Sequence, residues 1–389
     1  MVLKDYGFAF RRIRTPFYFY DMELLESTLS KYTGLLTSYG YVGHYALKAN
    51  FDSRIIESIR RNGLGVDCVS GNEVKLAVRS GFDPSEIVFA GVGKSDGEIR
   101  TALKAGISCF NCESIPEIKV IDGIAGRIGA KAGIALRINP DIDAHTHKYI
   151  STGRSEDKFG ISPWSFQDAL DTVSRCRNVT LTGLHFHIGS QITDLSVFKL
   201  LCNRVNELQQ WFTGHGAKLS TVNLGGGLGV DYENPDVNDI PPFEEYFGII
   251  NRNLEPLPGQ QVHFETGRAL VAQCGSLISR VLYVKIGKDR KFLIIDAGMN
   301  DLLRPALYGA YHRIDNLSSE GAATAYDVVG PVCESSDRWG DGRILPLSSR
   351  GDMIAIRSAG AYGQAMAMRY NCRSIAKAHY SDTIFPDKL

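Results

Sequence analysis

Between about residues 40 and 270, the sequence alternates eight short apolar runs with amphipathic stretches, and this alternation is the feature that most constrains the fold. In the longer stretches, such as residues 73–78 and 197–201, apolar residues recur at helical spacing. Strands that alternate with helices are typical of a parallel sheet. Eight such units in about 230 residues predict a (β/α)8 TIM barrel, an α/β fold. The expected strands are residues 45–48, 66–69, 87–90, 108–111, 134–137, 183–187, 222–225 and 262–265.

After residue 270 the pattern changes to extended apolar runs separated by turn residues, which predicts a C-terminal all-β domain. The aromatic run at residues 16–20 precedes the first barrel unit and is a candidate for an added barrel strand. We therefore expect two domains. Residues 22–270 form the barrel, and residues 1–21 plus 271–389 form the β domain.

The composition of the sequence excludes several classes of function. Lys+Arg and Asp+Glu number 43 each, and no basic run is interleaved with aromatic residues, so we expect no nucleic-acid partner. No apolar stretch approaches a bilayer span and residues 1–14 lack a secretory pattern, so we expect a cytoplasmic enzyme with no membrane partner. The eight cysteines are scattered, which favours free thiols, and the single CxxC at residues 109–112 has no second ligand pair. We expect no metal.

Polar residues follow several of the expected strands, where barrel enzymes place their active sites. Lys48 ends the first strand, and a desolvated lysine can form an imine with an aldehyde cofactor. Taken alone, Lys48 is more simply explained as a rim lysine in a salt bridge. The other strand-end residues that we expect at the same mouth are Asp67, Arg137, His187, the Gly225 cluster and Glu265.

The loop after the seventh strand is rich in glycine. Residues 223–229 read Asn-Leu-Gly-Gly-Gly-Leu-Gly, and the backbone of Gly226 and Gly227 can approach a phosphate with several N–H donors. Barrels usually hold phosphate after strands seven and eight, although a plain tight turn is the alternative explanation. The spacing differs from the dinucleotide-binding fingerprint.

Two further strand ends suit an aromatic cofactor. His187 can stack on such a ring, and Ser190 lies close enough in sequence to reach its phosphate. His185 and His187 point the same way from a strand, but a metal pair would need a third ligand. Glu265 can hold a pyridine nitrogen protonated, with a structural ion pair as the alternative.

The second domain carries polar loops among glycine and proline, at residues 296–308, 330–337 and 359–363, which suggests a site. A free cysteine is ordinarily a buried, inert thiol. Cys333 instead lies next to Glu334 in a Gly-Pro loop, which argues for exposure.

These motifs together resemble the fold-type III pyridoxal-phosphate decarboxylases, the family that includes enzymes acting on ornithine, arginine and diaminopimelate. The resemblance covers nearly the whole chain, and its motifs occur in order. The members that act on meso-diaminopimelate are the most similar, because of residues 145–153 leading to residues 158–160, and because of residues 304–308 and 333–335. Thr266 departs from the family, in which many members have proline.

The resemblance implies pyridoxal 5'-phosphate as the cofactor and a homodimer with shared active sites, in which Cys333 and Glu334 reach the cofactor of the partner chain. It implies these cofactor-binding residues: Lys48, His187, Ser190, Gly226, Gly227, Glu265, Arg268 and Tyr362. It implies these substrate-binding residues: Arg268, Arg304, Tyr308, Glu334 and Tyr362. It implies these catalytic residues: Lys48, His187 and Cys333, the last as the acid that protonates the intermediate.

Members of the family can be distinguished by the charged groups at the distal end of their substrates. A diamine-forming enzyme pairs a distal ammonium with carboxylates, whereas meso-diaminopimelate also keeps a distal carboxylate that needs an arginine. Arg304 with Tyr308, set against Glu334, supplies that combination. We therefore expect decarboxylation of meso-2,6-diaminopimelate to L-lysine and CO2, the final step of lysine biosynthesis.

Three alternatives remain. One is a related decarboxylase of another basic amino acid or of a carboxylated polyamine. A second is a non-catalytic pyridoxal-phosphate carrier or an inhibitor-like homologue that binds partner subunits. Such a protein would be expected to lack Lys48 or Cys333, and both are present. The third is an alanine racemase, but racemases tend to pair the pyridine nitrogen with arginine rather than with a residue such as Glu265.

Overall fold

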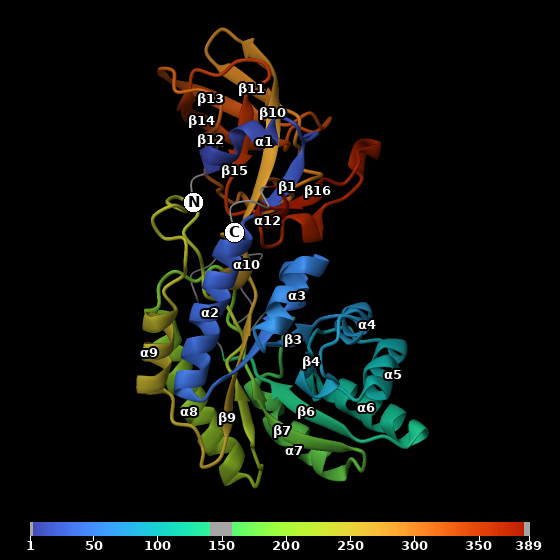
Figure 1. Ribbon diagram of the computed structural model, residues 1–389. Helices are drawn as coiled ribbons and strands as arrows, with labels where there is room; N and C mark the ends of the chain where they lie inside the picture. The colour runs from blue at the N-terminus through green and yellow to red at the C-terminus, as the bar shows by residue number, and fades with distance from the viewer. Residues whose placement is uncertain (1–2, 141–157, 385–389) are drawn as a thin grey trace. The chain divides into compact units, whose positions relative to one another are not determined.

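The structure, a computed structural model, describes residues 3–140 and 158–384. The chain divides into two compact units (Figure 1). The barrel unit comprises Leu29–Gly229 and Pro242–Gly267, and the β unit comprises Met1–Thr28, Val230–Pro241 and Arg268–Leu389. The segment Val230–Pro241 therefore groups with the β unit although it is flanked by barrel sequence.

Eight strands form a closed barrel in the barrel unit, and every neighbouring pair is parallel. The predicted fold class is confirmed, because eight apolar runs have become eight barrel strands. They are β2 (Val42–Ala46), β3 (Gly65–Cys68), β4 (Ile87–Phe89), β5 (Cys109–Cys112), β6 (Ala132–Arg137), β7 (Val179–His185), β8 (Thr221–Asn223) and β9 (Gln261–Thr266).

Helices lie outside the ring of strands, each burying an apolar stripe (Figure 1). Their ends follow from sequence: Ser95 and Glu98 form a capping box at the start of α5, and Gly106 ends it in the left-handed conformation (φ 74°). The helices are α2 (Met22–Tyr39), α3 (Ser53–Arg61), α4 (Gly71–Arg79), α5 (Asp96–Ala105), α6 (Ile115–Ile128), α7 (Phe166–Arg175), α8 (Ser196–Gly214) and α9 (Phe243–Asn253).

The β unit holds an eight-stranded sheet of mainly antiparallel strands. The strands are β1 (Phe17–Tyr20), β10 (Gly275–Ile286), β11 (Lys291–Ile295), β12 (Ile314–Asn316), β13 (Ala323–Val329), β14 (Arg338–Pro346), β15 (Met353–Ile356) and β16 (Lys377–Tyr380). Short helices accompany it: α1 (Gly7–Phe10), α10 (Arg268–Val271), α11 (Arg304–Tyr308) and α12 (Ser381–Ile384). Among the described residues, no helix is long and apolar enough to cross a membrane.

The run at residues 16–20 does not add a strand to the barrel, which corrects that expectation. It forms β1, which pairs antiparallel with β10 and parallel with β16. All four β1 side chains are buried, and Phe17 and Phe19 pack with Phe10 and Ile278 in an apolar cluster of the β unit. The barrel has no free edge to offer, because β2 already pairs with β9.

Thr266, the departure from the family pattern, has a structural partner at the end of β9. Its Oγ1 lies 2.8 Å from the Oη of Tyr32 in α2, and both residues are buried. A proline at this position would leave the Tyr32 hydroxyl without that partner. The substitution is therefore accommodated by a hydrogen bond between helix and strand.

We predict that Tyr32→Phe and Thr266→Val each lower the free energy of unfolding by about 1 kcal/mol, because each breaks the same buried hydrogen bond. The double variant should lose clearly less than the sum. Urea unfolding of the four proteins measures this. Strict additivity would show that the two hydroxyls do not interact.

Candidate active site

Lys48 lies in a 3-10 turn, Leu47–Ala49, directly after β2, and its side chain is half-buried. The charge of Lys48 opposes the rise in pKa that burial causes in two nearby carboxyl groups, those of Asp67 at the end of β3 and Glu73 in the first turn of α4. Burial raises the pKa of Asp67 well above its usual range, and nearby Glu265 adds to this while Lys48 opposes it. Asp67 Oδ1 is buried without a hydrogen-bond partner among the described residues, so the site has polar capacity to spare.

Glu265 is held by three donors inside the barrel. Asn111 Nδ2 donates to Oε1 at 2.9 Å, and Asn223 Nδ2 donates to the same oxygen at 2.7 Å. His185 Nε2 lies 2.7 Å from Oε2. Burial alone would raise the pKa of Glu265, but the charge and hydrogen bond of His185 hold it well below the usual range. The carboxylate is thus kept ionised at neutral pH.

The barrel interior below Glu265 is also polar. His44 Nδ1 lies 3.2 Å from the Glu86 carbonyl, so this nitrogen carries the proton and donates it. His44 Nε2 then accepts from His263 Nδ1 at 3.0 Å. Burial lowers the pKa of both rings, that of His263 to about 4. This pair is neutral, in contrast to the branched aliphatic residues that usually fill such barrels.

His187 follows β7 and presents a neutral ring. Its Nδ1 accepts a hydrogen bond from the backbone N–H of Gly226 at 3.3 Å. Burial and the neighbouring charges of Lys48 and Arg137 hold its pKa well below the usual range. A neutral, flat imidazole of this kind is suited to lie against an aromatic ring.

The glycine turn after β8 leaves no room for side chains. A Cβ on Gly225 would lie 2.2 Å from the Phe186 carbonyl oxygen, and one on Gly226 would lie 2.2 Å from the Glu265 carbonyl oxygen. Gly227 has φ +121°, a conformation that favours glycine. The loop that carries Ser190 runs beside this turn, since Ile192 N donates to Gly227 O at 2.9 Å. Backbone amides here can approach a phosphate closely.

The barrel unit therefore brings together the predicted residues Lys48, His187, Ser190, Gly226, Gly227 and Glu265. An amine, an ionised carboxylate, a neutral imidazole and a glycine turn suit pyridoxal phosphate, which has an aldehyde, a pyridine nitrogen, a flat ring and a phosphate. Among the described residues, no group of His, Cys, Asp or Glu could hold a metal ion. Residues 145–153, part of the family resemblance, lie outside the described residues.

A second group of predicted residues lies in the β unit around Tyr232. Arg268 Nη1 donates to Tyr232 Oη at 2.8 Å, and its guanidinium lies 4.9 Å from the ring centroid of Tyr362. Arg304, at the start of α11, lies 4.8 Å from the Tyr232 ring centroid and donates to His312 Nε2 at 2.8 Å. Both guanidinium groups are buried. Two buried cations in one cluster would suit the binding of an anion.

Cys333 and Glu334 are both exposed, as their Gly-Pro loop predicts. The backbone N–H of Cys333 donates to Asn371 Oδ1 at 3.0 Å, and the Tyr370 hydroxyl donates to Glu334. Buried Asp337 accepts from the N–H of Val332 at 2.6 Å and so fixes the base of the loop. The thiol is therefore presented on an anchored loop.

Sequence reasoning missed several of these groups. It did not identify Asn111 and Asn223 as partners of Glu265, and it considered His185 only as half of a metal pair. Polar residues at alternating positions of β5, β7 and β8 are a signal for an interior polar layer. No signal pointed to Tyr232 or His312.

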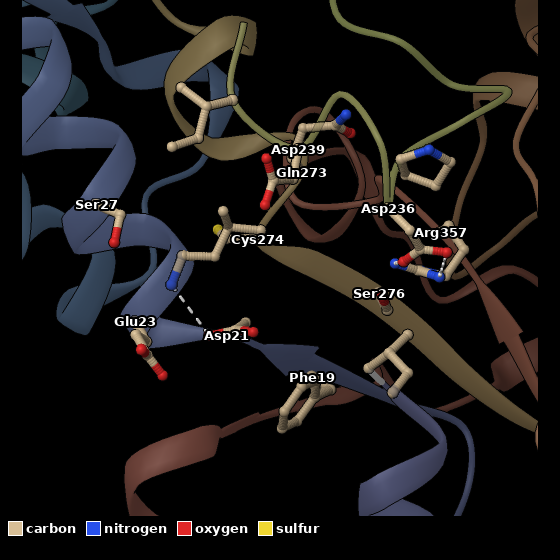
Figure 2. Close-up of a pocket in the computed structure, with 14 residues that line it drawn as sticks. Phe19, Asp21, Glu23, Ser27, Asp236, Asp239, Gln273, Cys274, Ser276 and Arg357 are labelled. Carbon is tan, nitrogen blue, oxygen red and sulfur yellow. Dashed lines mark hydrogen bonds and ion pairs between the residues drawn. The ribbon is translucent and has the colours of Figure 1, made fainter. Parts of the chain in front are cut away.

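A pocket of about 300 Å3 within the β unit contains none of the predicted site residues (Figure 2). Its lining includes Asp21, Glu23, Asp236 and Asp239, and Arg357 pairs with Asp236 at 2.6 Å. The acidic residues are exposed or already paired.

We predict that His263 makes the protein less stable in acid. Its folded pKa of about 4 lies below the unfolded value of about 6.5, so the unfolded chain binds the extra proton between these values. The stabilisation is complete above pH of about 6.5 and is lost as pH falls toward about 4, by at most about 1.4 kcal/mol per pH unit. Urea unfolding of His263→Asn should show a shallower loss than the wild type. A slope equal to that of the wild type would contradict the prediction, and exposed His215→Asn serves as the control.

Comparison with known proteins places this geometry in a family. Residues 25–272 match the family model of the pyridoxal-dependent decarboxylase, pyridoxal binding domain. A diaminopimelate decarboxylase from Bacteroides thetaiotaomicron is 52% identical over 96% of this chain and 97% of its own length. One from Neisseria meningitidis serogroup B is 41% identical over 93% of this chain and 86% of its own.

A solved structure agrees. Diaminopimelate decarboxylase from Helicobacter pylori, complexed with L-lysine, has a TM-score of 0.90 and 38% identity, covering 98% of each chain. The predicted fold, cofactor and enzyme class are confirmed by these matches. This chain belongs to the pyridoxal-dependent decarboxylase family, and diaminopimelate decarboxylases are among the relatives that match it along nearly its full length.

Proposed function

We propose that this chain decarboxylates meso-2,6-diaminopimelate to L-lysine and CO2 with pyridoxal 5'-phosphate, the final step of lysine biosynthesis. The observation that carries the substrate assignment is Arg304, whose guanidinium is 4% exposed and whose Nε has no hydrogen-bond partner in the part of the chain that the structure describes. Such a group is suited to a substrate carboxylate. Exposed Glu334 is suited to bind the ammonium group that lies beside this carboxylate in the substrate. A substrate without a distal carboxylate would leave Arg304 buried and unpaired.

In this proposal the barrel unit binds the cofactor. Lys48 would hold its aldehyde, His187 would support its flat ring, Glu265 would accept a hydrogen bond from its pyridine nitrogen, and Ser190 with the amides of Gly226 and Gly227 would hold its phosphate. Arg268 and Tyr362 complete the cofactor and substrate contacts. When bound, the cofactor would supply a protonated pyridine ring as an electron sink for the electron pair that departing CO2 leaves behind.

The task of Glu265 follows from its three donors. An ionised carboxylate beside the pyridine nitrogen stabilises the proton on that nitrogen. A protonated Glu265 would withdraw this support. Asn111, Asn223 and His185 keep Glu265 charged, so they act on the reaction through Glu265.

The remaining residues bind the substrate and move a proton. Arg304 and Tyr308, one turn apart on α11, bind the distal carboxylate, and Glu334 binds the distal ammonium. Cys333 donates its Sγ proton to the carbon that lost CO2. We infer a homodimer with shared sites, in which Cys333 and Glu334 of one chain serve the cofactor of the other. The exposure of this anchored loop supports that arrangement.

In the proposed function, the two domains have different roles. Residues 22–270 supply most of the cofactor contacts, while residues 1–21 plus 271–389 contribute Tyr362 and the loops for the substrate and the dimer. A reaction of amino-acid biosynthesis suits a cytoplasmic location, which is part of the proposal.

We expect the purified protein, supplied with pyridoxal 5'-phosphate, to release CO2 from meso-diaminopimelate and not from ornithine or arginine. Arg304→Ala should lower kcat/KM by about 100-fold or more while the cofactor absorbance is retained. Exposed Arg290→Ala is the matched control. Preference for ornithine or arginine would overturn the substrate assignment.

We expect His185→Phe to lower kcat by about 10- to 100-fold with little change in KM, because Glu265 loses its 2.7 Å donor and the pyridine nitrogen loses its counter-charge. His185→Gln, whose amide can donate to the same oxygen, should recover much of the rate. Cys109→Ala, in the same barrel interior, is the control. Equal rates for the Phe and Gln variants would show that the donor is unimportant.

A further inference from the structure

Arg304 is a buried cation whose hydrogen-bond and ring contacts with the described residues are with uncharged groups. Its Nη1 donates to His312 Nε2 at 2.8 Å, and its guanidinium lies 4.8 Å from the ring centroid of Tyr232. Within the parts of the chain that the structure describes, it has no carboxylate partner. Its Nε is buried and makes no hydrogen bond to any residue in the described ranges 3–140 and 158–384. A guanidinium in this state can be oriented by its neighbours without being neutralised by them.

The hydrogen bonds of His312 fix which nitrogen carries its proton. His312 Nδ1 lies 2.8 Å from the Arg357 carbonyl oxygen, which can only accept, so Nδ1 is the donor. Nε2 is left with a lone pair directed at Arg304 Nη1. Burial and the charge of Arg304 lower the pKa of His312 to about 3, so the ring stays neutral at working pH. His312 is thus a fixed acceptor for one arm of the guanidinium.

The surrounding contacts hold this pair in place. The Tyr232 ring packs edge-on against His312, with ring centroids 5.0 Å apart at an interplanar angle of 76°. The segment that carries Tyr232 is tied down by Asp236, which pairs with Arg357 at 2.6 Å (Figure 2). Arg357 also pairs with Asp315 at 3.0 Å. His312 therefore bonds to the backbone of a residue that is itself anchored on two sides.

We propose that His312 is a specificity-determining positioning residue. By accepting from Nη1, it turns the Arg304 guanidinium so that the remaining N–H groups meet the distal carboxylate of the substrate. This inference rests on the proposed function, because that function supplies the carboxylate. It predicts that His312 matters only for ligands that carry this group.

Two ligands separate this role from a general structural one. L-lysine keeps the distal carboxylate of meso-diaminopimelate, whereas pentane-1,5-diamine has the same chain and both amines but no carboxylate. Two variants of His312 are compared with these two ligands. In His312→Asn, the shorter side-chain amide can still donate to the Arg357 carbonyl but does not reach Arg304. His312→Gln can place its amide oxygen near the position of Nε2.

The experiment measures the binding of both ligands to the cofactor-loaded enzyme by calorimetry. In His312→Asn the Kd for L-lysine should rise by about tenfold, the equivalent of one charge-assisted hydrogen bond, while the Kd for pentane-1,5-diamine stays unchanged. KM for meso-diaminopimelate should rise by a similar factor with kcat nearly constant. His312→Gln should recover most of the L-lysine affinity. His379→Asn, another histidine of the β unit, should behave like the wild type.

The proposal is overturned if both ligands weaken together, if neither weakens, or if the Asn and Gln variants bind L-lysine equally. These outcomes are distinct from failure of the proposed function. That failure would appear in the wild type, as no CO2 release from meso-diaminopimelate. A wild type that is active, with L-lysine affinity unchanged in His312→Asn, refutes the role of His312 alone.

Discussion

An ionised carboxylate inside a closed barrel is the constraint on which the rest of the barrel unit depends. Glu265 is 7% exposed, and burial without compensation would neutralise it. Three strands each contribute one donor, so β5, β7 and β8 must keep the register that brings Asn111, His185 and Asn223 to one point. Polar residues replace the branched aliphatic side chains that usually fill such a barrel. The neutral His44–His263 pair fills the space below Glu265.

The two units surround their buried charged side chains in opposite ways. In the barrel unit, donors surround an anion and stabilise its charged form. In the β unit, Arg304 contacts a tyrosine and a neutral histidine, and in the proposed function its charge is available to the substrate carboxylate. A cation with no carboxylate partner among the described residues would favour ligands that carry a carboxylate, because other ligands could not pair with it.

Much of this was predictable, for a physical reason. In parallel barrels the C-terminal strand ends share one mouth, so a strand count was enough to predict that Lys48, His187 and Glu265 lie together. Residues that act through partners distant in sequence were not predictable. Periodicity gives the face on which Asn111 lies, but not that Glu265, 154 positions later, lies opposite it. Tyr232 follows a barrel strand, yet it packs against His312 because its segment groups with the β unit.

In the proposed function, Glu265 stays ionised and keeps the pyridine nitrogen of the bound cofactor protonated. Nitrogen NMR of wild-type enzyme loaded with cofactor labelled with 15N in the ring measures this directly. We predict the chemical shift of a protonated pyridine nitrogen at neutral pH, and we expect it to persist as the pH is raised for as long as the enzyme stays folded. The shift of an unprotonated pyridine at neutral pH would contradict it.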